Sequence, residues 1–418
     1  MKRIQTDLQK QVCLYSFLFK PLSICLNMRK IVIAIDSFKG CLSSEALENS
    51  IEKGIRKVWK DGIICKLPIA DGGEGTVEAL TRALGGKKIT CRVQGPLRSP
   101  VEAVYGWIPE RQMAVIEMAS ASGLPLIPWA EGNVMRTTSY GTGQLIADAL
   151  QHGCKHILLG IGGSATNDAG VGMLQALGFR FLDQQGKETG DGGSCLSQIC
   201  QIDTSQVLPQ LKTCDIEVAT DVKNPFYGEN GAAFVFAPQK GANQEQVKLL
   251  DDGLRSFAKL IQAKQGINVQ DIAGAGAAGG LGGGCVAFLQ AHLTPGIDKI
   301  KEYLNFDQLI HDADLIITGE GKVDQQTSQG KVVDGIIRSA QKYQIPVIIL
   351  TGNCQEKNEE IDENPFVSCF SIHSAPVSFD EAIQPEYAAQ QIERIAQMSC
   401  KLYRNGYEAS ILCKRKEL

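Results

Sequence analysis

The chain has 418 residues, of which 44% are hydrophobic and 21% charged, an ordinary composition for a globular protein of two or three domains. Its formal net charge of −4 argues against a nucleic-acid-binding protein, which usually carries a basic excess. No stretch reaches the roughly 18 apolar residues that a membrane span needs. Glycine is the unusual component, and the clustering of its 44 residues predicts loops that approach a ligand closely.

The 14 cysteines and five histidines predict no metal site. No C-x-x-C pair occurs, and the neighbours Cys195 and Cys200 have no histidine close by. His152 and His156 are four residues apart, but Gly153 between them is expected to end a helix. Because a chain of this length does not need a disulfide framework, we expect reduced, mostly buried cysteines and a cytoplasmic protein.

The N-terminal segment, residues 1–27, differs from the rest of the chain. A polar, basic stretch precedes an apolar one over residues 12–26, which Lys20 and Pro21 interrupt. No small-residue cleavage site follows, so we favour an upstream extension outside the fold, with Met28 as the natural start, over a secretory signal.

The first part of the chain alternates strands and helices. Residues 31–35 are a continuous apolar run typical of a strand buried on both faces, and residues 65–69 are predicted to form a second strand. Ser43 or Ser44 can cap the helix that follows the first strand, and another helix is predicted to begin near Thr76. This repeated β–loop–α pattern is that of a parallel α/β sheet.

The middle of the chain has a different pattern. Three predicted strands, at 88–93, 101–108 and 113–118, are joined by turns too short to connect parallel neighbours, so this sheet is expected to be antiparallel or mixed. The Ala/Gly-rich segment 273–284 predicts a tight turn or a closely packed helix start. The other predicted elements are a helix at 143–152 and strands at 156–159, 216–220 and 232–236.

Parallel-strand signals return in the last third, at 315–318, 347–350 and 367–372. The predicted fold class is therefore α/β. It combines a Rossmann-like (flavodoxin-like) parallel-sheet domain formed by both chain ends with an inserted α/β domain of mixed sheet. The predicted boundaries are 29–86 and 286–404 for the first domain and 87–285 for the inserted one.

Four loops with similar composition follow apolar strands, at the carboxyl ends where parallel sheets bind their ligands. Each combines glycines with acids, lysines or hydroxyls, the groups that phosphoryl transfer requires for metal binding and charge neutralisation. The third loop lacks the Walker A pattern and a complete G-x-G-x-x-G. The four loops are Asp36–Gly40, Asp71–Thr76, Gly160–Asp168 and Thr318–Thr327.

Two other classes of protein fit the sequence less well. A dinucleotide-dependent oxidoreductase would need G-x-G-x-x-G after the first strand and an acid about 20 residues later, and residues 36–40 supply neither. A binding module without catalysis does not need so many acids and lysines in glycine loops, since such groups are costly to assemble.

Seven motifs resemble those of the bacterial glycerate kinase family, in the family's order and across residues 28–404. The motifs are D-S-F-K-G (36–40), A-D-G-G-E-G-T (70–76), T-T-S-Y-G-T-G (137–143), G-G-S-A-T-N-D (162–168), A-T-D-V-x-N-P (219–225), G-A-A-G-G-L-G (276–282) and G-E-G-x-x-D-x-Q-T (319–327).

The resemblance implies ATP-dependent phosphorylation of D-glycerate in a cleft between two domains, with the 2-hydroxyl favoured over the 3-hydroxyl. ATP and Mg²⁺ are the expected cofactors. The expected partners are small molecules, with no nucleic acid and no membrane. The oligomeric state stays open, a homodimer included.

With this activity in view, Lys39 and Lys322 are expected to neutralise phosphate charge. Four acids compete for the metal and general-base roles. We expect Asp168 to be the base, with Glu320 and Asp324 near Mg²⁺. The competing acids are Asp71, Asp168, Asp221 and Asp324.

The remaining candidates bind substrate or phosphate. Backbone N–H groups of glycines would cradle the anions, and Arg136 is the candidate cation for the carboxylate of glycerate. The full set is Gly72, Gly73, Arg136, Thr137, Thr138, Ser139, Gly162, Gly163, Ser164, Asn167 and Asp221.

Overall fold

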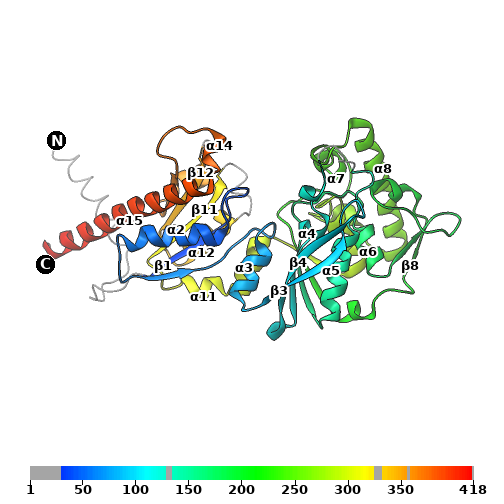
Figure 1. Cartoon of the computed structure of the whole chain (residues 1–418), viewed down its shortest axis with the longest axis horizontal. Helices are drawn as coiled ribbons and strands as arrows, with labels where there is room; N and C mark the ends of the chain where they lie inside the picture. The colour runs from blue at the N-terminus through cyan, green and yellow to red at the C-terminus, as the bar shows by residue number, and fades with distance from the viewer. Residues whose placement is uncertain (1–29, 129–133, 324–331, 355–357, 417–418) are drawn as a thin grey trace.

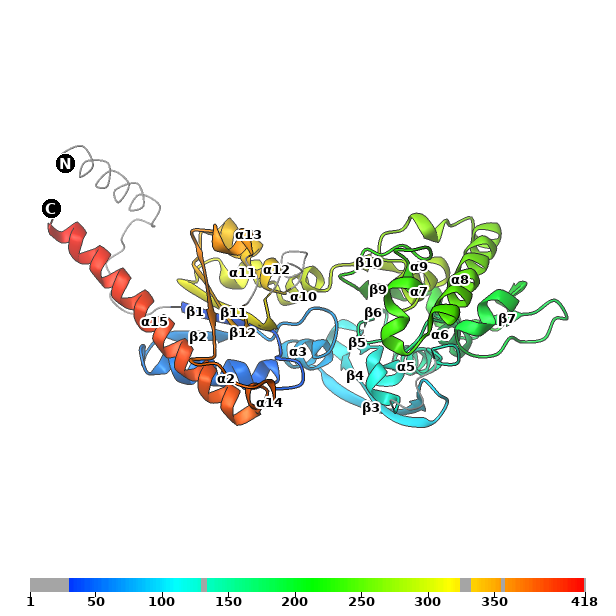
Figure 2. The same cartoon turned by 90° about the horizontal axis from the view of Figure 1, so that it is seen from above.

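The computed structural model describes residues 30–128, 134–323, 332–354 and 358–416. Two lobes lie side by side along the long axis of the molecule, with α3 (Thr76–Ala83) and α10 (Gly296–Leu304) where they meet (Figures 1 and 2). The chain leaves the first lobe through α3 and returns to it through α10. Among the described residues, no helix is both long enough and apolar enough to span a membrane.

The first lobe contains a parallel five-stranded sheet in the order β13-β12-β11-β1-β2. Ile31 of β1, the strand between β11 and the edge strand β2, lies opposite Leu315 on one side and Ile64 on the other. Residues from both ends of the chain form this sheet, which confirms the predicted fold class. The strands are β1 (Lys30–Ile35), β2 (Ile63–Lys66), β11 (Leu315–Lys322), β12 (Val347–Asn353) and β13 (Val367–Ser371).

Helices cover both faces of the first sheet because its strands are apolar on both faces. In β1, Ile33 belongs to the core under α2 (Ser44–Arg56) and α15 (Pro385–Lys416), whereas Val32 belongs to the core under α12 (Val332–Lys342) and α10. The Ser43 hydroxyl caps α2 by accepting from the Ala46 amide at 3.2 Å, as the sequence predicts. Three short helices complete the lobe: α11 (Phe306–Ile310), α13 (Glu359–Asp362) and α14 (Phe379–Ala382).

The second lobe contains a six-stranded mixed sheet in the order β10-β9-β6-β5-β4-β3. The pairs β3–β4 and β4–β5 are antiparallel and the others are parallel, as the short turns predict. The strands are β3 (Lys87–Gln94), β4 (Pro100–Ile108), β5 (Met113–Glu117), β6 (His156–Gly160), β9 (Asp215–Ala219) and β10 (His292–Thr294), beside a small hairpin of β7 (Arg180–Leu182) and β8 (Gln201–Asp203).

Two details of the second lobe correct the sequence predictions. β10 pairs with β9, so residues 292–294 lie in the second sheet although the predicted boundary assigned 286–404 to the first domain. The other domain boundaries stay predictions. Residues 232–236 form a helix, α7 (Ala232–Phe236), rather than a strand. Ala232 and Ala233 are both buried while Phe234 and Val235 are exposed, which a strand with alternating faces does not permit.

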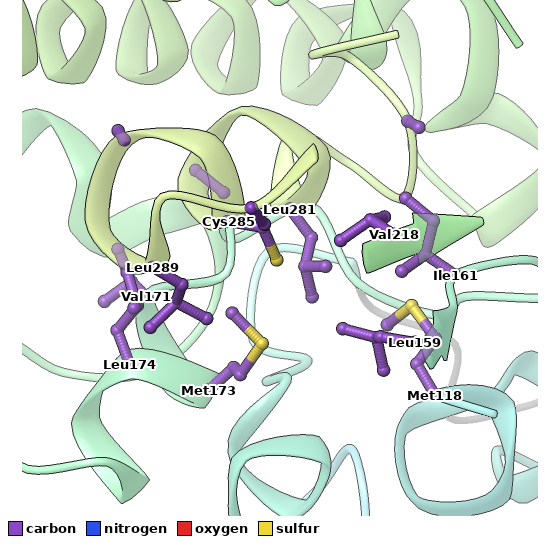
Figure 3. Packing of buried hydrophobic residues seen from close by; sticks show 14 of the residues in the cluster. Met118, Leu159, Ile161, Val171, Met173, Leu174, Val218, Leu281, Cys285 and Leu289 are labelled. Atoms are coloured by element: carbon purple, nitrogen blue, oxygen red, sulfur yellow. The ribbon is translucent and has the colours of Figure 1, made fainter. Parts of the chain in front are cut away.

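The core of the second lobe packs α9 against α6, the helix that follows residues 160–168. Figure 3 shows Cys285 and Leu289 of α9 facing Met173 of α6. The Ala/Gly-rich segment is the close-packed start of α9, since a Cβ on Gly283 would lie 2.6 Å from the Phe226 ring. The helices of this lobe are α4 (Ala119–Ser122), α5 (Tyr140–Gln151), α6 (Val171–Ala176), α7, α8 (Gln244–Gln265) and α9 (Leu281–Leu289).

Candidate active site

The order of the first sheet creates a switch point between β1 and β11, because the chain connections leave these two strands in opposite directions. Open α/β sheets bind ligands outside the carboxyl ends of the strands at such a point. Asp36 follows β1 there, and its amide donates to the Gly319 carbonyl of β11 at 3.1 Å. Glu320 and Lys322 lie at the end of β11.

Asp36 is the most perturbed acid at the switch point. Its side chain is buried, and its Oδ1 accepts from the Ser37 amide at 2.7 Å. Burial raises the pKa of Asp36 to about 8, with further contributions from the carboxylates of Asp71 and Glu320, whereas Lys39 and the Ser37 amide oppose the rise. In the sequence this acid is only one member of the 36–40 loop and is not among the predicted site residues.

Lys39 and Asp71 come from two different predicted loops and contact each other. The Lys39 ammonium donates to Asp71 Oδ2 at 3.0 Å, and the Gly73 amide donates to Asp71 Oδ1 at 2.8 Å. Burial disfavours the charged ammonium, but Asp71, Asp36 and Glu74 outweigh it, so the pKa of Lys39 is raised. Lys39 therefore stays cationic over the physiological range.

The Asp71 loop, residues 70–76, packs directly against the second lobe. A Cβ on Gly160 would lie 2.1 Å from the Gly72 carbonyl oxygen, and one on Gly162 would lie 3.3 Å from the Gly73 Cα. Gly72 also has φ +87° and lies against Ala219 of β9. Only glycine permits this approach, which brings three of the four predicted loops together at the junction of the lobes.

Glu117, at the carboxyl end of β5, is a second acid that the sequence analysis did not select. It accepts from the Val77 amide at 2.7 Å, at the N-terminus of α3. The pKa of Glu117 is raised to about 7, chiefly by burial and also by the carboxylates of Glu74 and Asp71, while the Val77 and Gly75 amides oppose the rise. Its position directly after the apolar strand 113–116 is the signal that could have identified it.

The tip of the glycine loop, residues 160–168, faces solvent. Gly162 and Gly163 are exposed, and their amides donate to no acceptor among the described residues. Ser164 follows, with a side chain in contact with the buried Lys240, whose ammonium donates to Ser164 Oγ at 2.8 Å and to the Thr166 carbonyl at 2.7 Å. Lys240 is a third residue that the sequence analysis missed, because it lies 76 positions from Ser164 in a segment without a motif.

Asp168 and the 137–139 segment hold the glycine loop from inside the second lobe. Asp168 is fully buried and accepts from the Ser139 amide and hydroxyl, both at 2.8 Å, and from two glycine amides. Burial raises the pKa of Asp168, while these donors lower it. The Thr137 hydroxyl donates to the Ala165 carbonyl at 2.7 Å, and the Thr138 hydroxyl accepts from the Tyr140 amide. This environment favours structural roles for all of them.

Three other predicted residues have different surroundings. Arg136 is exposed and makes no hydrogen bond or ion pair with any described residue. Asp221 accepts from the amide of Gly296, which packs against the Asp71 loop, at 3.1 Å, and it lines a cavity of about 370 Å³ with Lys223 and Arg338. Asn167 is buried within the second lobe. Asp324 lies outside the described residues.

Comparison with known proteins identifies the family. Residues 31–404 match the model of the glycerate kinase family. The chain belongs to this family. It is 46% identical over 357 residues to a glycerate kinase of Halalkalibacterium halodurans, covering 85% of this chain and 94% of the relative. It is 44% identical to a glycerate 2-kinase of Escherichia coli, covering 86% and 94%.

A solved structure of the same family has the same fold. The crystal structure of a putative glycerate kinase 2 from Salmonella typhimurium superposes with a TM-score of 0.81 at 42% identity, and the match covers 91% of this chain and all of that one. The family match spans both sheets and all the loops described above. The chain is therefore a kinase, as the motifs predict.

Proposed function

We propose that this chain transfers a phosphoryl group from ATP to D-glycerate, at the 2-hydroxyl, in the junction between the two lobes. The observation that carries this proposal is the meeting of the loops at 36–40, 70–76 and 160–168, beside the end of β11. The name of the Escherichia coli relative supports the 2-position.

In this proposal the triphosphate lies at the switch point between β1 and β11. Lys39 and Lys322 supply positive charge there, and a lysine stabilises the charge that develops on the transferred phosphoryl group. The Lys39–Asp71 ion pair fixes the ammonium before the nucleotide arrives. Fixing it beforehand lowers the reorganisation that the reaction step requires.

The acceptor substrate binds on the opposite side of the junction in this proposal. The amides of Gly162 and Gly163 have no acceptor among the described residues, and successive amides of this kind form a concave site for an anion. The carboxylate of glycerate would bind there, which points its hydroxyl toward the first lobe. Gly72 and Gly73 then act chiefly as close-packing positions between the two halves of the site.

We assign the general base to Asp36 in preference to Asp168. A base has to reach the substrate hydroxyl, and the Asp168 carboxylate is enclosed by four donors inside the second lobe. Asp36 lies at the switch point, and its pKa of about 8 suits a group that accepts a proton near neutral pH. Asp71 then serves to orient Lys39.

The residues at the switch point fit a Mg²⁺ ion bound mainly through the nucleotide. Burial is the main cause of the raised pKa of Asp36, and the carboxylates of Asp71 and Glu320 add to it, so these two acids supply the negative charge that a bound cation would meet. No group of three or more acidic, histidine or cysteine side chains in the described part of the chain is close enough to hold a metal alone. Mg²⁺ is usually bound by one or two carboxylates and the phosphates, and it neutralises charge on the phosphate oxygens. Glu320 and Asp324 stay the proposed ligands.

The test is a coupled ADP-release assay with ATP, Mg²⁺ and either D- or L-glycerate, followed by phosphorus NMR of the product. We expect ADP release that depends on D-glycerate and a spectrum of 2-phosphoglycerate. A 3-phosphoglycerate spectrum would contradict the assigned hydroxyl only, while folded protein that releases no ADP with either enantiomer would contradict the substrate.

A further inference from the structure

Lys240 is a cation enclosed beneath the glycine loop. Its side chain is 5% exposed, and lysine is almost never buried without a compensating partner. Its ammonium donates to two neutral oxygens, Ser164 Oγ and the Thr166 carbonyl. The acid that acts on it is Asp168, whose carboxylate is already held by four other donors. Burial lowers the pKa of Lys240 to about 7, and Asp168 opposes this shift.

The contact with Lys240 determines what the Ser164 hydroxyl can do. In its ammonium form, which the Asp168 carboxylate favours, Lys240 has three donors and no acceptor, so Ser164 Oγ accepts in this pair. Among the described residues this is the only hydrogen bond of the Ser164 side chain, and its own proton has no acceptor there. Ser164 is 8% exposed and follows the exposed tip of the loop. The Ser164 hydroxyl proton is therefore available to donate to a group on the side away from Lys240.

Other polar groups of the glycine loop also have no hydrogen-bond partner among the described residues. The amides of Gly162 and Gly163 donate to nothing among the described residues. Thr166 Oγ1 and both polar atoms of the Asn167 side chain are fully buried without a protein partner in that same part of the chain. Buried polar groups normally have partners, so a loop with several unsatisfied ones indicates a ligand or ordered water that the protein alone does not supply.

We propose that Lys240 is a positioning residue for a carboxylate subsite at the tip of the glycine loop, where it holds the Ser164 hydroxyl as a donor to the acid group of the substrate. This inference rests on the proposed function, since it places the hydroxy acid on the second lobe. The buried ammonium supplies positive charge beneath the anion without contacting it. The subsite selects hydroxy acids over neutral polyols, because a neutral group gains nothing from that charge.

The test compares D-glycerate with its neutral methyl ester as acceptors for the Lys240→Met variant. The variant loses the hydrogen bond from the Lys240 ammonium to Ser164 Oγ, and we expect this loss to lower kcat/KM for D-glycerate about 10- to 100-fold. The KM for ATP and the activity with the ester are expected to stay within about twofold. Lys301→Met is the control, because Lys301 also donates to a carbonyl, Gly335 O at 3.1 Å, and a serine hydroxyl, Ser339 Oγ at 3.3 Å, away from the glycine loop. It differs from Lys240 in its ion pair with Asp298 at 3.2 Å.

The outcomes separate this inference from the proposed function. An equal loss with D-glycerate and the ester, or a rise in the KM for ATP, would show that Lys240 only supports the fold and would overturn the inference. If Lys240→Met fails to fold, Ser164→Ala must reproduce the selective loss, and unchanged selectivity in that variant overturns it. If the wild-type protein phosphorylates neither acceptor, the proposed function fails, and calorimetric binding of D-glycerate to wild type and Lys240→Met still decides the subsite.

Discussion

At the scale of single residues, the site is governed by how burial changes the behaviour of charged groups. Burial and nearby carboxylates raise the pKa values of Asp36 and Glu117. Burial lowers the pKa of Lys240. Asp36 and Glu117 lie at strand ends near the junction of the lobes, and Lys240 lies beneath the glycine loop in the second lobe. Perturbed groups gathered in one place are typical of functional sites.

Replacing Asp36 by Asn is expected to lower kcat about 100-fold or more, the usual contribution of a general base, with little change in the KM for ATP. The pKa of Asp36 also predicts that kcat/KM of the wild-type protein rises with pH and levels off above about pH 8, because the base acts in its ionised form. Steady-state kinetics from pH 6 to about pH 9 check both. Asp61→Asn, at an exposed position, is the control. A wild-type profile that is flat over this range would contradict the assignment of Asp36.

Replacing Glu117 by Gln is expected to remove a pH dependence of stability. The pKa of Glu117 is about 7 in the folded protein and 4.5 as its ordinary value, so the folded state binds the proton more tightly. Relative to Glu117→Gln, the wild-type free energy of unfolding should fall as pH rises from about 4.5 to about 7, by up to about 3 kcal/mol. Urea denaturation of both proteins at several pH values measures this. Parallel curves for the two proteins would refute it.

At the scale of elements, the glycine loops act as packing surfaces as much as anion sites. The Asp71 loop reaches the carboxyl ends of β6 and β9 because glycine carries no Cβ at Gly72 and Gly160. The N-terminus of α3 is tied to β5 through Glu117. These contacts determine where the first lobe meets the second, and therefore where the two halves of the site face each other.

Gly160→Ala is expected to destabilise the protein by about 1–3 kcal/mol and to lower kcat, because the new methyl group would meet the Gly72 carbonyl at 2.1 Å and displace the Asp71 loop. Gly190→Ala is the control, since a Cβ on Gly190 would have no other atom within 4 Å among the described residues. Thermal denaturation and steady-state kinetics of both variants measure the effect. Wild-type stability and turnover in Gly160→Ala would show that the contact is unimportant.

At the scale of the whole molecule, one site draws on two lobes with separate cores. The core between the first sheet and α2 and α15 contains no residue of the second lobe, and the core of the second lobe contains none of α2 or α15, within the described ranges. A third core crosses the junction, because it includes Ile108 of β4 and Leu158 of β6 beside Ile316 of β11. Ligand binding is therefore expected to stabilise both lobes together.

Adding ADP at about 100 times its Kd should stabilise the protein by about 2.7 kcal/mol, and D-glycerate should add to this, because both ligands bind only the folded protein. Lys39→Met should lose the response to ADP and keep that to D-glycerate, while Lys53→Met, on the exposed side of α2, should keep both. Scanning calorimetry measures these shifts. A response to ADP that survives in Lys39→Met would place the nucleotide elsewhere.

The strands of the first sheet could be predicted because apolar runs such as 31–35 and 347–350 are buried on both faces. The antiparallel pairs of the second sheet could be predicted because short turns exclude parallel pairing. The failures have physical causes. β10 has only three residues, which is too few for a periodic signal. Residues 234–236 of α7, Phe-Val-Phe, have a composition typical of strands, but the packing of this segment makes it a helix.

Local patterns in the sequence are enough to predict the family, the α/β class with two sheets, and the four candidate loops, since motifs and periodicity are local properties of the chain. Which members of those loops meet follows only from the folded structure. It brought Lys39 to Asp71, enclosed Asp168 inside the second lobe, and placed Lys240 beneath Ser164. The reason is that burial and contact between residues far apart in the chain are set by how the two sheets pack, and these fix the charge and hydrogen bonding of each group.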